Sequence, residues 1–240
     1  MTLELPITNR THAVLHLFGL NIYITDTVIT TWIIMGVLII FAVIVRIKVN
    51  RFNDVPKGFQ NVIELLVEAF DNYLKNITGE KLSFLGYWFF TVFAFILISN
   101  ISGLVFVGLL RPPTADWSMV FALALVTFFL IHIMALKYRG REYLKSFAKP
   151  YYMAFLFLPI NIISELAKPI SLSFRIFGNI LSGVVIIALI YNVTPFFARI
   201  GLPIVLHGYF DLFAGILQAY IFVTIGLTFI ANAVVSDEPN

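Results

Sequence analysis

The sequence of 240 residues contains no cysteine and few charged residues, and each shortage excludes a class of protein. The lack of cysteine excludes disulfide bonds, thiol catalysis and thiolate metal sites. Charged residues make up only 12% of the chain, about half the share found in soluble domains. A soluble domain is therefore excluded as well.

The residues that are present indicate a membrane protein. Hydrophobic residues make up 60% of the chain, and the mean hydropathy is +0.95. The fold class that follows is an all-α polytopic membrane protein, with residues 1–240 forming a single membrane domain. The net charge of +3 is small and gathers beside the apolar segments, which fits membrane topology and predicts no nucleic-acid binding.

Hydropathy predicts about five spans and one surface helix. Residues 1–55 form an outer N-terminal segment and a first span over 28–45. Residues 59–74, within the segment 56–80, place apolar side chains at helical spacing with charges on the other faces, which is typical of a helix lying along the membrane surface. Residues 84–137 contain the second and third spans, at 84–110 and 119–136.

Basic residues give the orientation. They follow the first span in 46–51 and the third span in 137–149. Because basic loops stay in the cytoplasm, the N-terminus is predicted outside the cell and the C-terminus in the cytoplasm.

The segment 150–235 is predicted to form a hairpin of two long, tilted helices. Residues 154–191 would make a helix of roughly 57 Å against a hydrocarbon core of about 30 Å, so it must tilt strongly or break. Pro159 and Pro169 supply bends. A connector over 195–203 leads to a second apolar segment, 204–235.

Polar residues in this hairpin align along two stripes. At 100° per residue the first stripe falls within roughly 80° of one helix face, with Glu165 beside it; its members are Lys168, Ser171, Arg175, Asn179 and Ser182. The second stripe consists of His207, Asp211, Gly215 and Gln218. Two facing stripes would line an aqueous route or contact a partner; the alternative is that the polar groups only bond each other between the helices.

Arg175 is the strongest indicator of function. A guanidinium cannot be deprotonated in proteins, and in hydrocarbon it costs roughly 2.5–3.5 kcal/mol even on the lenient insertion scale. Such a residue predicts a functional site. The alternative is an arginine at a helix end that reaches the headgroups.

The chain resembles subunit a of F-type ATP synthases over most of its length. The resemblance is carried by residues 171–182 (SLSFRIFGNILS) and by four further motifs in the same order along the chain. These are 99–104 (SNISGL), 112–116 (PPTAD), 122–125 (ALAL) and 217–222 (LQAYIF). Jointly the motifs are highly specific.

The resemblance implies a stator beside a rotating ring of ion-carrying c-type subunits, in a bacterial cell (inner) membrane. In the family, the arginine matching Arg175 faces the ring carboxylates between two aqueous half-channels, near the residues matching Asn179 and Gln218. A peripheral stalk of b-type subunits and the membrane lipids are the other implied partners. The chain contains no G-x-x-x-x-G-K-[ST] loop, so it is predicted to be non-catalytic, with no cofactor and no metal site.

The chain departs from the family pattern in one half-channel. Many members carry a polar pair there, and this sequence has Val184 and Asp211 at the two positions. Asp211 would serve that channel alone or with Glu165, which matches a carboxylate of some bacterial members, as Lys168 matches a lysine.

Three alternatives stay open. Protons are the family default, but sodium is a possible coupling ion. A self-contained secondary transporter would use Arg175 to bind an anionic substrate, and a structural scaffold would hold the ring and the stalk without lining a path.

Overall fold

The structure is a computed structural model that describes residues 11–17, 19–105, 110–148, 151–193, 201, 205–206 and 208–234. The chain divides into two compact units. Unit 1 contains residues 1–51, 93–120 and 175–219, and unit 2 contains 52–92, 121–174 and 220–240. That the whole chain is one membrane domain stays a prediction.

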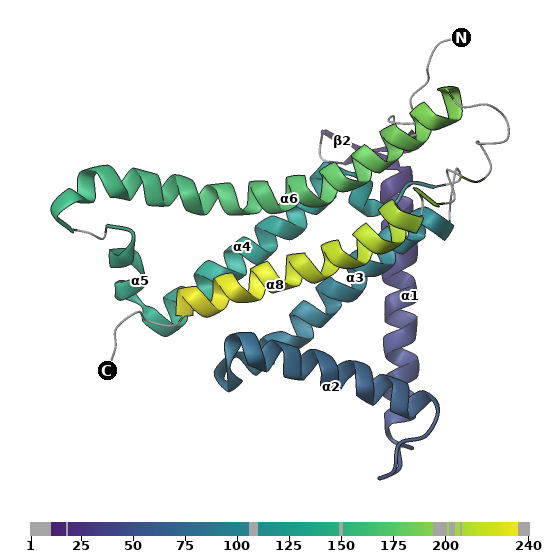
Figure 1. The fold of residues 1–240 in the computed structure, drawn as a ribbon, viewed down its shortest axis with the longest axis horizontal. Coiled ribbons are helices and arrows are strands. Elements are labelled where there is room, and N and C mark those ends of the chain that lie inside the picture. The colour runs from purple at the N-terminus through teal and green to yellow at the C-terminus, as the bar shows by residue number, and fades with distance from the viewer. Residues whose placement is uncertain are drawn as a thin grey trace. The chain divides into compact units, whose positions relative to one another are not determined.

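The elements follow one another along the chain as drawn in Figure 1. They are β1 (Thr11–Leu17), β2 (Leu20–Thr25), α1 (Asp26–Val49), α2 (Phe59–Thr78), η1 (Glu80–Leu85), α3 (Gly86–Val105), η2 (Pro113–Ala115), α4 (Trp117–Arg139), α5 (Arg141–Ser146), η3 (Tyr151–Met153), α6 (Ala154–Val193), η4 (Gly208–Phe213) and α8 (Ala214–Val234). Five helical segments of the described chain are long and apolar enough to cross a membrane. The predicted class, a helical protein with about five spans, is confirmed.

Unit 1 begins with an element that the sequence analysis did not predict. Strands β1 and β2 pair antiparallel, with Leu17 opposite Leu20. The turn between them contains Gly19 at a φ of 80°, a value that glycine adopts without steric cost. A two-stranded hairpin is marginally stable by itself. Its two strands are also short, so their sequence pattern is weak compared with that of the long apolar helices.

The interior of unit 1 combines apolar and polar side chains. Ile34 of α1, Ile96 of α3 and Ile176 of α6 are almost fully buried. Thr30 is equally buried, and its hydroxyl donates to the Asp26 carbonyl at 2.8 Å. This bond to the preceding turn satisfies the hydroxyl inside helix α1.

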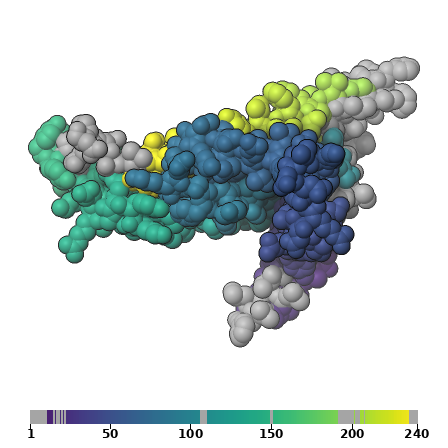
Figure 2. Space-filling view, turned by 90° about the horizontal axis from the view of Figure 1, so that it is seen from below, coloured from purple at the N-terminus to yellow at the C-terminus, as the bar shows by residue number. Residues whose placement is uncertain are grey.

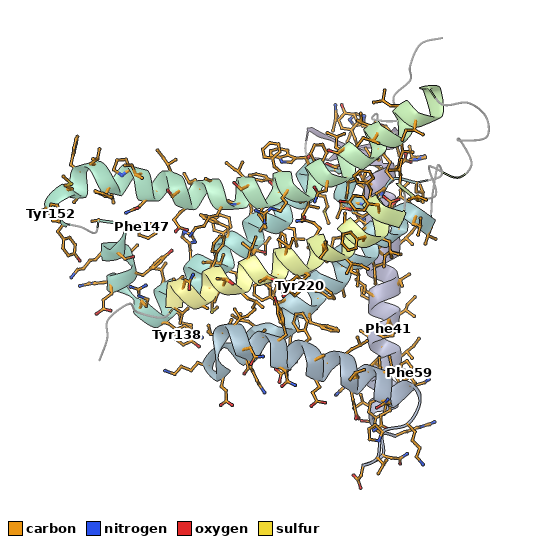
Figure 3. The ribbon with its side chains drawn as sticks, viewed as in Figure 1. Phe41, Phe59, Tyr138, Phe147, Tyr152 and Tyr220 are labelled. Atoms are coloured by element: carbon orange, nitrogen blue, oxygen red, sulfur yellow. The ribbon has the colours of Figure 1, made fainter. Side chains whose placement is uncertain are left out.

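The rest of α1 exposes apolar side chains over several turns. Ile39, Ile40 and Ile47 are each more than 60% exposed, and Phe41 points away from the helix in Figure 3. Apolar side chains exposed all along a helix are typical of a lipid-facing span.

Unit 2 has an apolar interior in which a glycine makes room for an aromatic ring. Phe89, Phe222 and Leu227 are fully buried. A Cβ atom at Gly226 would stand 2.8 Å from Cε1 of Phe89, which is closer than real contacts allow. Gly226 of α8 therefore permits the close packing of α3 against α8 in this unit.

Helix α2 is amphipathic, as predicted, and its inner face packs against α8. The Tyr73 and Thr224 hydroxyls are 2.5 Å apart, and the rings of Tyr73 and Tyr220 lie 5.4 Å apart, with Tyr220 directed toward α2 in Figure 3. Leu65 and Leu66 are exposed, and side chains of α2 lie open at the surface in Figure 2. Its position along the membrane surface stays a prediction.

Helix α6 runs unbroken through both prolines. The segment was predicted to tilt strongly or break, and Pro159 and Pro169 do not end the helix. A proline removes one backbone donor, and helices that span membranes tolerate this loss because neighbouring groups satisfy the freed carbonyl. The tilt of α6 relative to the membrane stays a prediction.

The last segment differs from the predicted continuous helix over 204–235. Its described part contains a π-helical stretch, η4, and α8 begins only at Ala214. A π-helical stretch widens the turn and redirects the side chains that it carries. The predicted connector at 195–203 lies outside the described residues, except for Gly201.

Candidate functional site

The polar stripe of α6 is open to the surface. Ser171, Arg175, Asn179 and Ser182 are all exposed. The three last-named residues belong to unit 1, whereas Ser171 belongs to unit 2. Arg175 forms no ion pair with a carboxylate among the described residues. Its guanidinium is therefore available to a partner that contacts this face of α6.

Asn179 connects α6 to α8 within unit 1. Its amide nitrogen donates to the side-chain oxygen of Gln218 at 3.0 Å. Gln218 is only 3% exposed, and its own amide nitrogen has no hydrogen-bond partner among the described residues. The two stripes therefore meet at Asn179 and Gln218, which were predicted to lie close together.

A second contact in unit 1 fixes the direction of the pairing. A Cβ atom at Gly183 would stand 3.0 Å from Cβ and Cγ of Phe210. Asn179 precedes Gly183, whereas Gln218 follows Phe210, so the two segments run antiparallel. The predicted hairpin pairing is confirmed for these segments.

The carboxylate of Asp211 lies against α3. A Cβ atom at Gly103 would stand 3.8 Å from Cγ of Asp211 and 3.5 Å from Cγ of Pro112. Asp211 sits in η4 and is half-buried. Three segments of unit 1, namely α3, the loop before α4 and η4, therefore meet at Gly103.

Asn100 is the residue that sequence reasoning missed at this site. Its side-chain nitrogen donates to the Gly215 carbonyl at 2.9 Å, and its oxygen accepts from the Thr114 hydroxyl at 2.8 Å. Asn100 and Thr114 are both buried. The signal was present in the motifs 99–104 and 112–116, but the sequence alone does not show that these motifs meet beside Gly215.

Glu165 and Lys168 form an ion pair in unit 2. Their carboxylate oxygen and ammonium nitrogen are 2.5 Å apart, and the Lys168 nitrogen lies 4.6 Å from the centre of the Phe229 ring. Lys168 also lines a small, mostly apolar pocket with Thr127, Leu172 and Gly226. The pair belongs to a different unit from Arg175 and Asp211.

A further polar cluster lies where strand β1 meets the start of α1. His12 Nε2 is 2.5 Å from a carboxylate oxygen of Asp26, which is 5% exposed. The Thr27 hydroxyl donates to Asp116 at 3.1 Å. Burial lowers the pKa of Arg111, while the charges of Asp26 and Asp116 act in the opposite direction.

His207 lies outside the described residues, so its place beside Asp211 stays a prediction. Among the described residues no group of histidines and carboxylates has the arrangement of a metal site.

Comparison with known proteins identifies the family. The model of the family described as ATP synthase A chain matches residues 28–231. ATP synthase subunit a of Moorella thermoacetica is 35% identical over 222 residues, which cover 92% of this chain and 95% of the relative. ATP synthase subunit a of Desulfosudis oleivorans is 34% identical over 212 residues, covering 86% of each chain. The chloroplastic subunit a of Stigeoclonium helveticum is 31% identical over 222 residues, which cover 87% of this chain and 84% of the relative.

The matched region contains Arg175, Asn179, Asp211 and Gln218, together with the motif residues that surround them. It begins near the start of α1 and ends in the last turns of α8. The chain is a multi-pass membrane protein and belongs to the ATP synthase A chain family.

Proposed function

We propose that this chain is the stator subunit of a rotary F-type ATP synthase and passes protons through two aqueous half-channels to and from the carboxylates of a rotating c-type ring. Arg175 separates the two half-channels. The observation that carries this proposal is the exposed Arg175, without an ion pair to a described carboxylate, one turn from the Asn179–Gln218 hydrogen bond. A cation so placed is available to a carboxylate of a partner.

The fixed charge explains how ions are exchanged. A guanidinium favours the ionised form of a carboxylate beside it, so a protonated ring site that reaches Arg175 releases its proton into the exit channel. The same charge repels a cation that would cross directly from one half-channel to the other. Each proton carries about 2.3 kcal/mol per 100 mV across the membrane, so a leak past Arg175 would waste the gradient.

The two half-channels use different acids of the chain. Asp211, with His207, lines the outer half-channel, and the partial burial of Asp211 where three segments meet supports this role. Glu165 and Lys168 border the cytoplasmic half-channel, where their ion pair places polar groups beside a mostly apolar pocket. Ser171 and Ser182 extend the polar face of α6 on either side of Arg175.

The remaining surfaces fit the same assembly. The N-terminus lies outside the cell and the C-terminus in the cytoplasm, as the basic residues in the last turns of α1 and α4 favour. The exposed, charged face of α2 contacts the b-type subunits of the peripheral stalk. The chemistry of ATP takes place in other subunits.

Replacing Arg175 by glutamine in the assembled complex tests this proposal. Gradient-driven ATP synthesis in inverted membrane vesicles should be lost, while the complex still assembles, because the exposed side chain contributes to ion exchange rather than to packing. Arg141→Gln, at an exposed position at the start of α5, is the matched control and should leave synthesis unchanged. Near-normal synthesis by Arg175→Gln would favour a structural scaffold.

The isolated chain distinguishes the stator from a self-contained transporter. Reconstituted alone in lipid vesicles, the stator should move no ion or anionic substrate, since it needs the ring. Transport by the isolated chain would contradict the proposal. Running the synthesis assay with a sodium gradient and with a proton gradient identifies the coupling ion.

A further inference from the structure

We infer that Asn100 is a positioning residue: bound to the Gly215 carbonyl and held by Thr114, it fixes the first turns of the last helix and thereby places the Asp211 carboxylate in the outer half-channel. The inference depends on the proposed role of Asp211. It concerns residues of unit 1 alone.

The hydrogen bonds of Asn100 have only one consistent arrangement. The Gly215 carbonyl can only accept, so the amide nitrogen of Asn100 must face it, at 2.9 Å. The amide oxygen then faces the Thr114 hydroxyl, which donates at 2.8 Å. Both side chains are buried, at 4% and 3% exposure, so neither bond competes with water.

The contact between α3 and α8 is close enough for the position of Asn100 to determine the position of Gly215. A Cβ atom at Gly215 would stand 2.8 Å from the Cβ of Asn100, so only glycine fits there. The next contact along the same pair of segments joins Gly103 and Asp211, where the corresponding distance to the Asp211 Cγ is 3.8 Å. Asn100 and Gly103 are three residues apart on α3, and Asp211 and Gly215 are four apart. The two contacts therefore lie one turn apart on antiparallel segments.

The backbone around Asp211 needs such a support. Asp211 lies in the π-helical stretch η4, and regular α-helix begins at Ala214, one residue before Gly215. A π-helical turn is rarer than an α-helical turn and is found mostly as a single turn at functional sites. The hydrogen bond from Asn100 fixes the position of Gly215, just after this turn. It therefore determines where the π-helical turn holds the Asp211 carboxylate.

Thr114 ties this support to the loop before α4. It belongs to η2, which follows Pro112, and Pro112 packs beside Gly103, the residue of α3 that also faces the Asp211 carboxylate. One short segment therefore orients Asn100 and packs at the same glycine as Asp211. Loss of the Thr114 hydroxyl would leave Asn100 free to rotate while its bond to Gly215 remains available.

Asn100→Leu and Thr114→Val test the inference in the full complex. Each variant keeps the number of side-chain heavy atoms of the native residue and removes hydrogen-bonding atoms. ATP synthesis driven by a proton gradient in inverted vesicles should fall roughly three- to tenfold in Thr114→Val, which loses one hydrogen bond, and at least as much in Asn100→Leu, which loses two. The pH dependence of synthesis should shift in the same direction as in Asp211→Asn.

Ser102→Ala is the matched control. Ser102 is buried on the same helix, and its hydroxyl donates to the Ser99 carbonyl at 2.7 Å. This variant also loses one buried hydroxyl but does not touch the Asn100 contacts. It should leave the pH profile unchanged, whereas an equal shift in Ser102→Ala would overturn the inference.

Double variants separate a failure of the inference from a failure of the proposed function. In an Asp211→Asn background, Asn100→Leu should cause no further shift of the pH profile, because the group that it positions is already absent.

If Asp211→Asn alone leaves the rate and the profile unchanged, the proposed role of Asp211 is wrong. If Asp211→Asn shifts the profile and neither Asn100→Leu nor Thr114→Val does so, only the positioning role is wrong. Should Asn100→Leu fail to assemble, the milder Thr114→Val decides.

Discussion

The interiors of the two units differ in chemistry. In unit 1, the buried polar residues outnumber the buried apolar residues among those that the structure describes; they are Asp26, Thr27, Thr30, Ser99, Asn100, Ser102, Thr114 and Gln218. In unit 2, buried apolar residues outnumber polar ones several-fold, and Phe89, Phe222 and Leu227 are fully buried. Burying polar groups costs free energy unless they are hydrogen-bonded, so the interior of unit 1 depends on its hydrogen bonds, whereas the interior of unit 2 depends on apolar packing.

The two units also use glycine differently. Gly226 in unit 2 admits the ring of Phe89, whereas Gly215 in unit 1 admits the polar side chain of Asn100. Both glycines belong to α8. Helix α8 thus packs against an aromatic ring in unit 2 and against a hydrogen-bonding side chain in unit 1. Packing in unit 1 therefore also determines the direction in which polar side chains point.

The largest expected effect on assembly comes from the apolar interior of unit 2. Phe89→Ala should destabilise the chain by on the order of 3 kcal/mol, because the fully buried ring loses its packing contacts and leaves a cavity. The amount of complex recovered from membranes should fall, while the synthesis rate per assembled complex stays near normal. Phe155→Ala, at a side chain that is 97% exposed, is the control. A normal yield with a lost rate would contradict the division between the units.

Arg175→Lys sharpens the comparison on the side of unit 1. The compact ammonium lacks the planar guanidinium fork, so the synthesis rate should fall on the order of tenfold to hundredfold, the effect of about one charge-assisted hydrogen bond. The yield of complex should not change. Rate and yield measured on the same membranes check this prediction, and full activity of the lysine variant would show that charge alone is sufficient.

Asp211→Asn should have a smaller effect on the rate. Water still conducts through a channel that lacks one carboxylate, so proton flux should fall roughly tenfold or less, and the pH dependence of synthesis should shift because a carboxylate that passes protons to the ring is lost. Asp54→Asn, at an exposed position before α2, is the control. An identical response of both variants would assign the outer half-channel to other residues.

The smallest effect is expected for Tyr143→Phe in unit 2. Burial and, to a smaller extent, the Glu165 charge raise the pKa of Tyr143 from 10.0 to about 12, while the Arg139 charge acts in the opposite direction. Because the folded state holds the phenolic proton more tightly, the resulting stability is present below pH 10 and is lost as the pH rises to about 12. Thermal stability in detergent over an alkaline pH series should fall less steeply for Tyr143→Phe. The native protein and Tyr143→Phe should have the same thermal stability at neutral pH. Parallel stability curves over the whole pH series would contradict the prediction.

Most of the helices could be predicted from the sequence because their signals are local. The predicted spans correspond to α1, α3, α4 and α6 within a few residues, since apolar runs and their basic flanks decide where a helix crosses a membrane. The β1–β2 hairpin and the π-helical stretch at 208–213 were not predicted. Both are short and marginal by themselves, and they depend on the segments packed against them.

The sequence by itself determined that this chain is a helical membrane protein of the ATP synthase A chain family, and that Arg175 and Asn179 share one face of a helix. The reason is that helical periodicity fixes the neighbours of a residue along its own helix. Only the tertiary structure decided that Asn179 bonds Gln218, that Asn100 bonds Gly215 and that Asp211 lies against Gly103. These pairs depend on the register between helices, which is set by how small and large side chains pack where the helices meet.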